Sequence, residues 1–300
     1  MKHALLKAGH LPSMIRDACT GVVKNRLRLA TRAVVLALAA GSSNAVAGSV
    51  LQPGGTVGLP AGALLREGIY FVDTSSYGQR TTTPSGLGVN LPQIVWATPL
   101  YFYDTRLQFI VLQPSAYTTL AAHNVFYLNS TLIAGQLAHT FGNGFSVSYM
   151  AGFRSAMPAP QAFQFDSFEQ RLAVSYTASG WDLTANVING LFGSGNLRYP
   201  DWLNVDLTAT KKFDKFEIGA VAFGSSDISS PRPSYKRQGQ IAVGGLVGYD
   251  FRIFKLQAYA TRDVSERGYT GYDTRGWLRL IVPFYAAPQM AAAEPIRERY

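Results

Sequence analysis

Residues 201–224 read DWLNVDLTATKKFDKFEIGAVAFG, and this stretch decides the fold. Apolar side chains recur at every second position, as at Leu203, Val205 and Leu207, and polar side chains occupy the positions between them. A period of two puts these two sets on opposite faces of a strand, whereas the period of a helix, 3.6, would scatter them. The stretch therefore predicts a β-hairpin that turns around Asp214 and has one apolar face.

The same alternation recurs along the chain and predicts an all-β fold, a transmembrane antiparallel β-barrel of about twelve strands. Short connections near residues 104, 143, 179, 214 and 251 alternate with longer polar ones, a pattern typical of barrels with short periplasmic turns and longer outer loops. Strands of about ten residues also match a tilted path across the bilayer. The predicted strands are 66–77, 91–101, 107–113, 131–141, 145–154, 168–177, 181–189, the two within 201–224, 238–249, 253–263 and 276–285. The predicted longer loops lie near 78–90, 114–130, 155–167, 190–201, 225–237 and 264–274.

The composition agrees with strands that have one apolar and one uncharged polar face. Charged residues make up 15% of the chain, below the quarter or so of ordinary globular domains. A mean hydropathy of +0.05 is far too low for a bundle of membrane helices. Seven of the 27 basic and one of the 18 acidic residues lie in residues 1–47, so the net charge of +9 falls to +3 for the remainder. This distribution argues against a nucleic-acid partner.

Residues 1–47 resemble a secretory signal peptide that is cleaved. Basic residues precede the apolar run 33–40, and Ala45 and Ala47 form an A-x-A cleavage box. Translation begins at Met1 or at Met14, and the alternative reading of the run is a buried helix of the mature domain.

After cleavage the mature chain divides into three parts. We expect a short periplasmic N-terminal segment at 48–65, the transmembrane barrel at 66–285 and a periplasmic tail at 286–300, for which a plug role is the alternative. The single cysteine, Cys19, lies in the leader, so the mature chain has no disulfide, metal thiolate or thiol nucleophile.

Nine polar or charged residues fall at predicted inward positions, and we expect them to line the lumen. One reading is structural, because barrel interiors need hydrogen-bonded and ion-paired side chains. The other is a solute pathway. These nine residues include both acidic and basic side chains, which favours a neutral or weakly polar solute. Glu217 and Lys255 are the expected constriction residues. The nine are Arg171, Asp182, Asn186, Asn204, Asp206, Glu217, Lys255, Gln257 and Arg279.

The sequence offers little material for catalysis or metal binding. The mature chain has two histidines, His123 and His139, without a pair at i, i+4. A nucleophilic serine needs a base and an orienting partner, and His139 lies at an apolar position of a predicted strand. The glycine-rich run 190–195 does not join a strand to a helix, so it does not match a phosphate-binding loop. We expect no enzyme, no metal and no cofactor.

Several stretches resemble a known family, the outer-membrane transporter-like proteins of the meta-pathway of phenol degradation. They are LPAGALLREGIYF (59–71), LPQIVWATPLYFYDTRLQF (91–109), YTASGWDLTANVINGLFGSGN (176–196) and GWLRLIVPF (276–284). The resemblance covers nearly all of the mature chain. It implies a barrel that moves hydrophobic aromatic compounds across the outer membrane, and it assigns no binding residue.

These observations predict a passive channel in the bacterial outer membrane for small, aromatic or phenolic, solutes. The expected partners are outer-membrane lipid, a small hydrophobic or aromatic solute, and the barrel-assembly machinery, because the last strand resembles its signal. One alternative is a closed structural or adhesion barrel, since twelve strands leave a narrow lumen. The other is a barrel lipase or protease, for which the two histidines offer poor material.

Overall fold

The computed structural model describes residues 52–82, 85–120, 123–156, 162–163, 165–192 and 199–286. All of them lie in one compact unit, which spans residues 43–300. The predicted signal peptide (1–47), its cleavage residues Ala45 and Ala47, and the predicted tail beyond Ala286 lie outside the described residues, so these expectations stay predictions. Within the described ranges no helix is long and apolar enough to cross a membrane.

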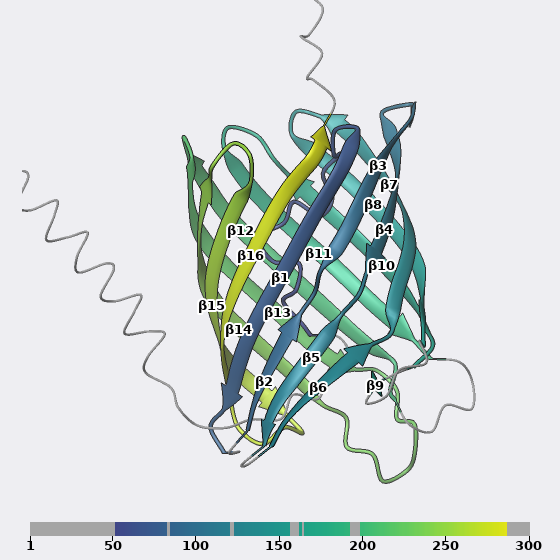
Figure 1. The fold of residues 1–300 in the computed structure, drawn as a ribbon, viewed down its shortest axis with the longest axis vertical. Helices are drawn as coiled ribbons and strands as arrows, with labels where there is room; N and C mark the ends of the chain where they lie inside the picture. Colours follow the sequence, from purple (N-terminus) through teal and green to yellow (C-terminus); the bar gives the residue numbers. More distant parts are fainter. Residues whose placement is uncertain are drawn as a thin grey trace, which may run out of the picture. The chain divides into compact units, whose positions relative to one another are not determined.

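In the described part of the chain, twelve antiparallel strands form a closed ring, as predicted (Figure 1). β16 pairs with β1 from Gly68↔Ala286 to Arg80↔Asp273, and this pairing closes the barrel. Closure leaves neither of these strands as a free edge, as a wall in lipid requires. The ring consists of β1 (Gly68–Arg80), β3 (Gln93–Phe102), β4 (Thr105–Leu112), β7 (Thr131–Gly142), β8 (Phe145–Ser155), β10 (Ser167–Tyr176), β11 (Trp181–Leu191), β12 (Trp202–Phe213), β13 (Phe216–Asp227), β14 (Gly239–Asp250), β15 (Lys255–Arg267) and β16 (Asp273–Ala286).

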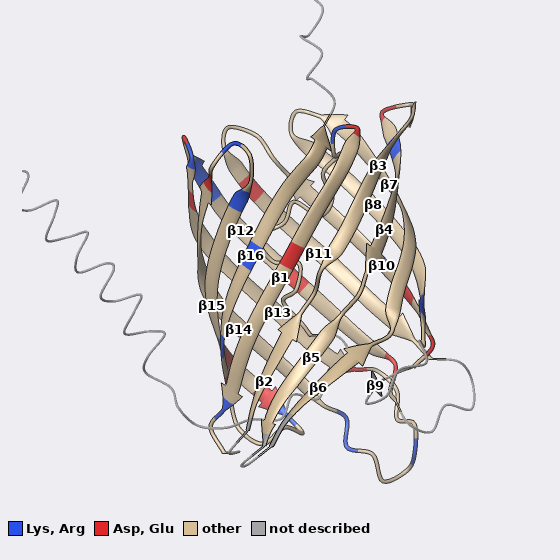
Figure 2. Cartoon of the chain, viewed as in Figure 1, with Lys and Arg blue, Asp and Glu red and all other residues tan. Residues whose placement is uncertain are grey.

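The alternation of exposed and buried side chains follows the parity of the sequence. Along β11, Trp181 and Leu183 are exposed on the outer wall, while Asp182 and Thr184 are buried toward the lumen. The predicted assignment of faces is confirmed there and in β8 and β12. Most of the outer wall carries neither acidic nor basic residues (Figure 2). The wall therefore presents an apolar band, the surface that hydrocarbon would cover.

The short turns lie at one end of the barrel, the upper end in Figure 1, together with the start of β1 and the end of β16. The turn between β7 and β8 has positive φ at Gly142, Asn143 and Gly144. Asparagine and glycine adopt this left-handed backbone more readily than other residues, which explains the Asn-Gly signal in the sequence. Asp214 adopts the same backbone region, with a φ of 55°, in the turn that joins β12 to β13.

In two segments predicted as loops, 78–90 and 114–130, most of the described residues instead extend the wall, so these two expectations were wrong. β2 (Ser85–Asn90) pairs with β1, β5 (Ser115–Leu120) pairs with β2, and β6 (His123–Asn129) pairs with β5. A two-residue strand, β9 (Ala162–Phe163), adds to β6 in parallel.

Prolines explain why these extensions are separate strands. Pro92 stands between β2 and β3, and Pro114 stands between β4 and β5. Proline has no N–H, so it interrupts the ladder of backbone hydrogen bonds. The carbonyl groups of the two prolines still form hydrogen bonds at these interruptions. Pro92 O accepts from the N–H of Gln113, and Pro114 O accepts from the N–H of Asn129.

One polar group interrupts the apolar outer wall beside this break. Asp73 lies at an outward position of β1, and its Oδ1 accepts a hydrogen bond of 2.6 Å from Nδ2 of Asn90. The same amide nitrogen donates to Ser75 Oγ at 2.8 Å. The three side chains satisfy one another where lipid offers no partner.

We predict that Leu207→Arg destabilises the barrel by about 2–4 kcal/mol, the cost of a charge near the bilayer midplane. Leu207 is 45% exposed on the outer wall near the middle of β12. The measurement is the free energy of unfolding in lipid vesicles by urea titration. The matched control is Ile253→Arg, at the turn between β14 and β15, where the cost falls to about 0–1 kcal/mol. Equal costs at both positions would contradict the proposed depth of the wall.

Candidate functional site: the barrel lumen

The lumen holds a segment of the chain itself. Residues 52–65, hereafter the lumenal segment, precede β1 and hydrogen-bond to inward side chains of several strands. Figure 1 shows part of it as a purple trace inside the ring. We expected 48–65 to lie in the periplasm, and for the described residues of that range the structure contradicts this. The physical reason is that the inward side chains of a narrow barrel need polar partners, and the backbone of the segment supplies them.

Asp206 holds the first part of the lumenal segment. Its carboxylate accepts hydrogen bonds from the N–H of Gly54 at 3.1 Å and from the N–H and hydroxyl of Thr56 at 2.9 and 2.6 Å. Asn186 Nδ2 donates to the same threonine hydroxyl at 2.8 Å. Because bonds to a charged acceptor are stronger than neutral ones, this carboxylate is a firm anchor.

Arg279 and Gln257 hold the other side of the segment through its carbonyl groups. Arg279 donates through Nη2 to Gly55 O at 2.7 Å and through Nη1 to Val57 O. Gln257 Nε2 donates to Gly58 O at 2.8 Å. Two N–H groups of the segment thus contact an acidic side chain, and three of its carbonyls contact basic and amide side chains.

Two glycines explain why the segment fits. Gly54 and Gly58 have φ of 84° and 80°. A Cβ at Gly54 would lie 2.5 Å from the ring of Phe223, and one at Gly58 would lie 2.4 Å from Leu246 Cδ1. The sequence did carry a signal, because residues 52–65 are glycine-rich and uncharged, which is unusual for a periplasmic linker.

The structure brings together the two residues expected at the constriction. Lys255 Nζ lies 2.5 Å from Glu217 Oε2. Glu217 also accepts hydrogen bonds from Thr210 Oγ1 at 2.7 Å and Gln257 Nε2 at 2.9 Å. The carboxylate is buried with three partners, so the pair supports the lumen wall as well as contributing charge to it.

All nine predicted lumen residues lie at inward positions, and eight of them are buried. Asp182 accepts a hydrogen bond from Thr184 at 2.7 Å, and Arg171 lies 3.9 Å from Glu169. Asn204 is fully buried. Four of the nine contact the lumenal segment directly, namely Asn186, Asp206, Gln257 and Arg279. Their part in solute passage stays a prediction.

A charged cluster near the loop end was missed by the sequence analysis. Arg80 donates to Asp263 Oδ2 at 3.1 Å and to Gln240 Oε1 at 2.5 Å. The ring of Tyr269, from the loop before β16, lies over the Arg80 guanidinium with its centroid 4.0 Å away. Burial raises the pKa of the Tyr269 phenol further above physiological pH, where a phenol is already neutral. Arg80 falls in a segment that we expected to be a loop, which explains the omission.

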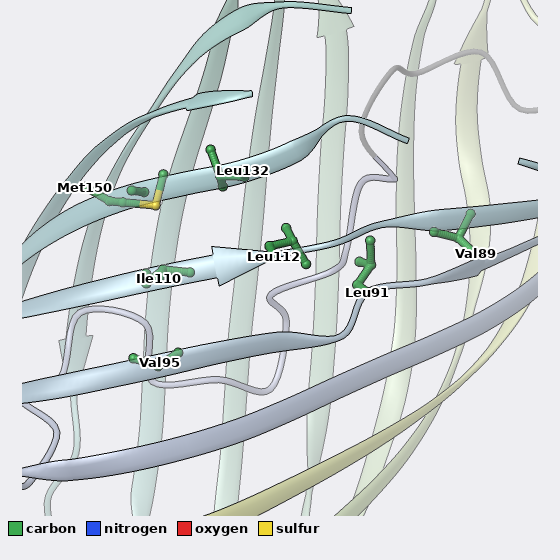
Figure 3. Close-up of a cluster of buried hydrophobic side chains, with 8 residues drawn as sticks. Val89, Leu91, Val95, Ile110, Leu112, Leu132 and Met150 are labelled. Atoms are coloured by element: carbon green, nitrogen blue, oxygen red, sulfur yellow. The ribbon is translucent and has the colours of Figure 1, made fainter. Parts of the chain in front are cut away.

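The opposite part of the lumen wall is apolar, and we call it the apolar lane (Figure 3). β3, β4 and β7 carry apolar side chains on both faces, so they read as apolar runs rather than as alternating strands. That departure from alternation was the available sequence signal. The lane consists of Val89, Leu91, Val95, Ile110, Leu112, Leu132, Ala134 and Met150.

A cavity of about 380 Å³ lies between the lumenal segment and the apolar lane. Leu59, Ala63 and Leu65 line it from the segment, while Val95 and Ile110 line it from the wall. Small-molecule sites range from about 300 to 1,000 Å³ and are mostly apolar with a few polar groups. Four charged residues, Arg171, Asp182, Lys212 and Lys255, also line it. The cavity therefore has the size for one small molecule, and its lining combines apolar side chains with several polar and charged groups.

The histidines show no catalytic arrangement in the described residues. Nδ1 of His139 lies 3.0 Å from Thr105 Oγ1, and its ring packs against Phe141. The side chain of His123 lies outside the described residues. Within those residues no three His, Cys, Asp or Glu side chains are grouped to hold a metal ion. The absence of an enzymatic activity stays a prediction.

Comparison with known proteins adds a family and a fold. A family model described as putative MetA-pathway of phenol degradation matches residues 34–280. No curated protein matches the chain. An outer membrane channel from Pseudomonas putida F1 has a TM-score of 0.59 at 11% identity, over 77% of this chain and 99% of that chain. The CymD monoaromatic hydrocarbon channel has a TM-score of 0.45 at 10% identity, over 80% of this chain and 95% of that chain. The first likeness shows that the fold is shared.

We predict that Asp206→Ala loosens the lumenal segment, because it removes three hydrogen bonds to a carboxylate. Hydrogen bonds to charged groups are worth about 1.5–3 kcal/mol each, so exposure of the segment rises at least about tenfold. The measurement is the rate at which a thiol reagent modifies Val57→Cys in a chain whose Cys19 is replaced by serine. Thr210→Ala is the control, because Thr210 bonds to Glu217 and has no bond to the segment. Unchanged labelling would show that Asp206 does not hold the segment.

Proposed function

This chain belongs to the family described as putative MetA-pathway of phenol degradation, and from that membership and the geometry of the lumen we propose that it is a channel in the bacterial outer membrane. In this proposal small aromatic solutes diffuse through the barrel down their concentration gradient. No cofactor and no covalent step take part.

The observation that carries this proposal is the division of the lumen into a polar and an apolar part. The lumenal segment is bonded to the polar wall formed by β11, β12, β15 and β16. Two residues of the apolar lane, Val95 on β3 and Ile110 on β4, face the cavity. A lumen that only needed filling would satisfy its polar groups everywhere, whereas the apolar lane offers a surface on which aromatic rings lose contact with water.

The lane also suits a solute that must leave again. Transfer of apolar surface out of water gains about 25 cal/mol per Å², which favours entry of an aromatic ring. Conduction further requires that binding be weak enough for release. The lane contributes aliphatic side chains and few hydrogen-bond partners, so a ring gains entry without being held by strong directional bonds.

Solute passage need not displace the anchored part of the lumenal segment. The charged and amide anchors act on residues 54–58, whereas two serine hydroxyls hold Ala61 and Gly62. Leu59, Ala63 and Leu65 line the cavity. A solute in the cavity therefore contacts the apolar end of the segment, and the charged anchors stay paired. The lumenal segment narrows the lumen, and a solute that moves along the apolar lane contacts fewer polar groups than it would elsewhere in the lumen.

The closed structural barrel is the second candidate, and the occupied lumen favours it. A barrel filled by its own chain needs no solute, and the buried ion pairs and hydrogen bonds would then serve only stability. Transport measurements separate the two functions, because a closed barrel has the same fold and no flux.

We predict that cells with this protein in an intact outer membrane take up radiolabelled toluene several-fold faster than cells without it. Ile110→Asn, which places an amide in the apolar lane, lowers that rate several-fold. The aromatic ring of toluene then displaces water from the amide and offers it no hydrogen bond, which is unfavourable. Ile110→Leu keeps the lane apolar and serves as the control. The amount of folded protein in each strain is measured from heat-modifiable migration on gels. Equal uptake with and without the protein would favour the closed barrel.

We also predict that Glu217→Ala combined with Lys255→Ala raises single-channel conductance in planar bilayers by about twofold, because it removes two charged side chains from a narrow passage. Lys211→Met is the control, since Lys211 lies at the barrel end over Trp181. A double variant with the conductance and ion selectivity of the original protein would refute the expected constriction.

A further inference from the structure

A pair of glutamines interrupts the apolar lane, and it is the strongest unassigned feature of the lumen. Gln108 on β4 and Gln136 on β7 are directly opposite one another in the ladder. Both point inward, since the next residue along β4, Phe109, is exposed on the outer wall. Both line the cavity between the lane and the lumenal segment.

The hydrogen bonding of this pair is incomplete. Gln136 Nε2 donates to Gln108 Oε1 at 3.2 Å. Gln108 is fully buried, and its own Nε2 has no hydrogen-bond partner in the described residues. A buried donor left without an acceptor costs about 1–3 kcal/mol, so its persistence calls for an explanation such as a ligand or a bound water.

The surroundings decide which molecule would serve as that acceptor. Ile110 and Ala134 stand two positions away on the same faces of β4 and β7, and Met150 lies opposite Gln136 on β8. An apolar body therefore fits beside the pair, and the N–H of Gln108 Nε2 lacks an acceptor. A small aromatic ring that carries a hydroxyl group combines these two features.

We propose that Gln108 and Gln136 form a polar subsite that binds the oxygen of hydroxylated aromatic solutes and makes the lumen select them over plain aromatic hydrocarbons. The free amide of Gln108 donates to the solute oxygen while the ring lies on the apolar lane. The selection rests on the proposed channel function, because it names the solute class that the same lumen favours.

The position of the pair along the lane supports this role. The ladder runs from Gln93↔Leu112 through Val95↔Ile110 to Ala97↔Gln108, so the amides follow the apolar side chains toward the end of the barrel that carries the short turns. A solute moving past Val95 and Ile110 along the lane therefore reaches the hydrogen-bond donor of Gln108 next. The solute exchanges apolar contact with the lane for a hydrogen bond to Gln108. Because neither contact is very strong, the solute can also leave, as conduction requires.

The test compares phenol with toluene, which differ by a hydroxyl in place of a methyl group. Uptake of each is measured in cells that carry the original protein, Gln108→Met, or Gln108→Met with Gln136→Met. A neutral hydrogen bond contributes about 0.5–1.5 kcal/mol, so the ratio of phenol to toluene uptake falls about 2- to 10-fold in the variants. Toluene uptake itself is expected to stay the same or to rise.

Gln170→Met is the matched control. Gln170 lies at an outward position of β10, where it accepts from Tyr149 and donates to Asn189. The Gln170→Met variant makes the same chemical change outside the cavity, so we expect its ratio of phenol to toluene uptake to be unchanged. A ratio that also stays unchanged in both cavity variants, or equal losses of phenol and toluene uptake, would overturn the subsite.

A binding measurement separates failure of the subsite from failure of the channel. Fluorine NMR of purified, folded protein reports the affinities of 4-fluorophenol and 4-fluorotoluene without any transport. If the original protein prefers the phenol and Gln108→Met abolishes that preference, the subsite stands even where uptake shows no channel. If the original protein binds both alike, the subsite is refuted whatever the uptake shows.

Discussion

The backbone hydrogen bond is the constraint on which this structure depends. A strand wall surrounded by hydrocarbon has no water to satisfy a free edge, so every strand of the ring needs a partner on each side. The pairing of β16 with β1 over the whole length of β1 meets this requirement. Closure then forces a two-sided wall, because successive side chains of each strand point alternately to lipid and to the lumen.

A closed ring of twelve strands creates a second problem, since its interior is narrow and lined by polar side chains. The chain solves it with its own backbone. The N–H groups of Gly54 and Thr56 meet Asp206, and the carbonyls of Gly55 and Val57 meet Arg279. These bonds satisfy part of the polar half of the lumen, and the apolar lane remains as the face on which a solute can move.

Several features were predictable because they depend on local periodicity. The inward position of Asn204 and Asp206 follows from the parity of β12, and the reversal at Asp214 follows from the charged break between two alternating runs. The partners of these residues were not predictable. Asp206 and Thr56 are 150 positions apart, and no short-range pattern reports a contact over that separation. The strands β2 and β5 were missed because glycine, serine and proline in these segments are typical of loops. The pairing of β2 with β1, and of β5 with β2, makes them strands.

The sequence by itself determined the barrel, its twelve ring strands and, in the strands that alternate, the side that faces lipid and the polar residues that face the lumen. Those properties follow from a period of two and from turn residues with left-handed backbone, both of which are written in neighbouring positions. The tertiary structure alone decided what occupies the lumen. Which inward side chains hold the lumenal segment, and which are left to form the apolar lane and the Gln108–Gln136 pair, depends on distances across the closed ring. Closure brings those residues together, and the order of the residues along the chain does not record it.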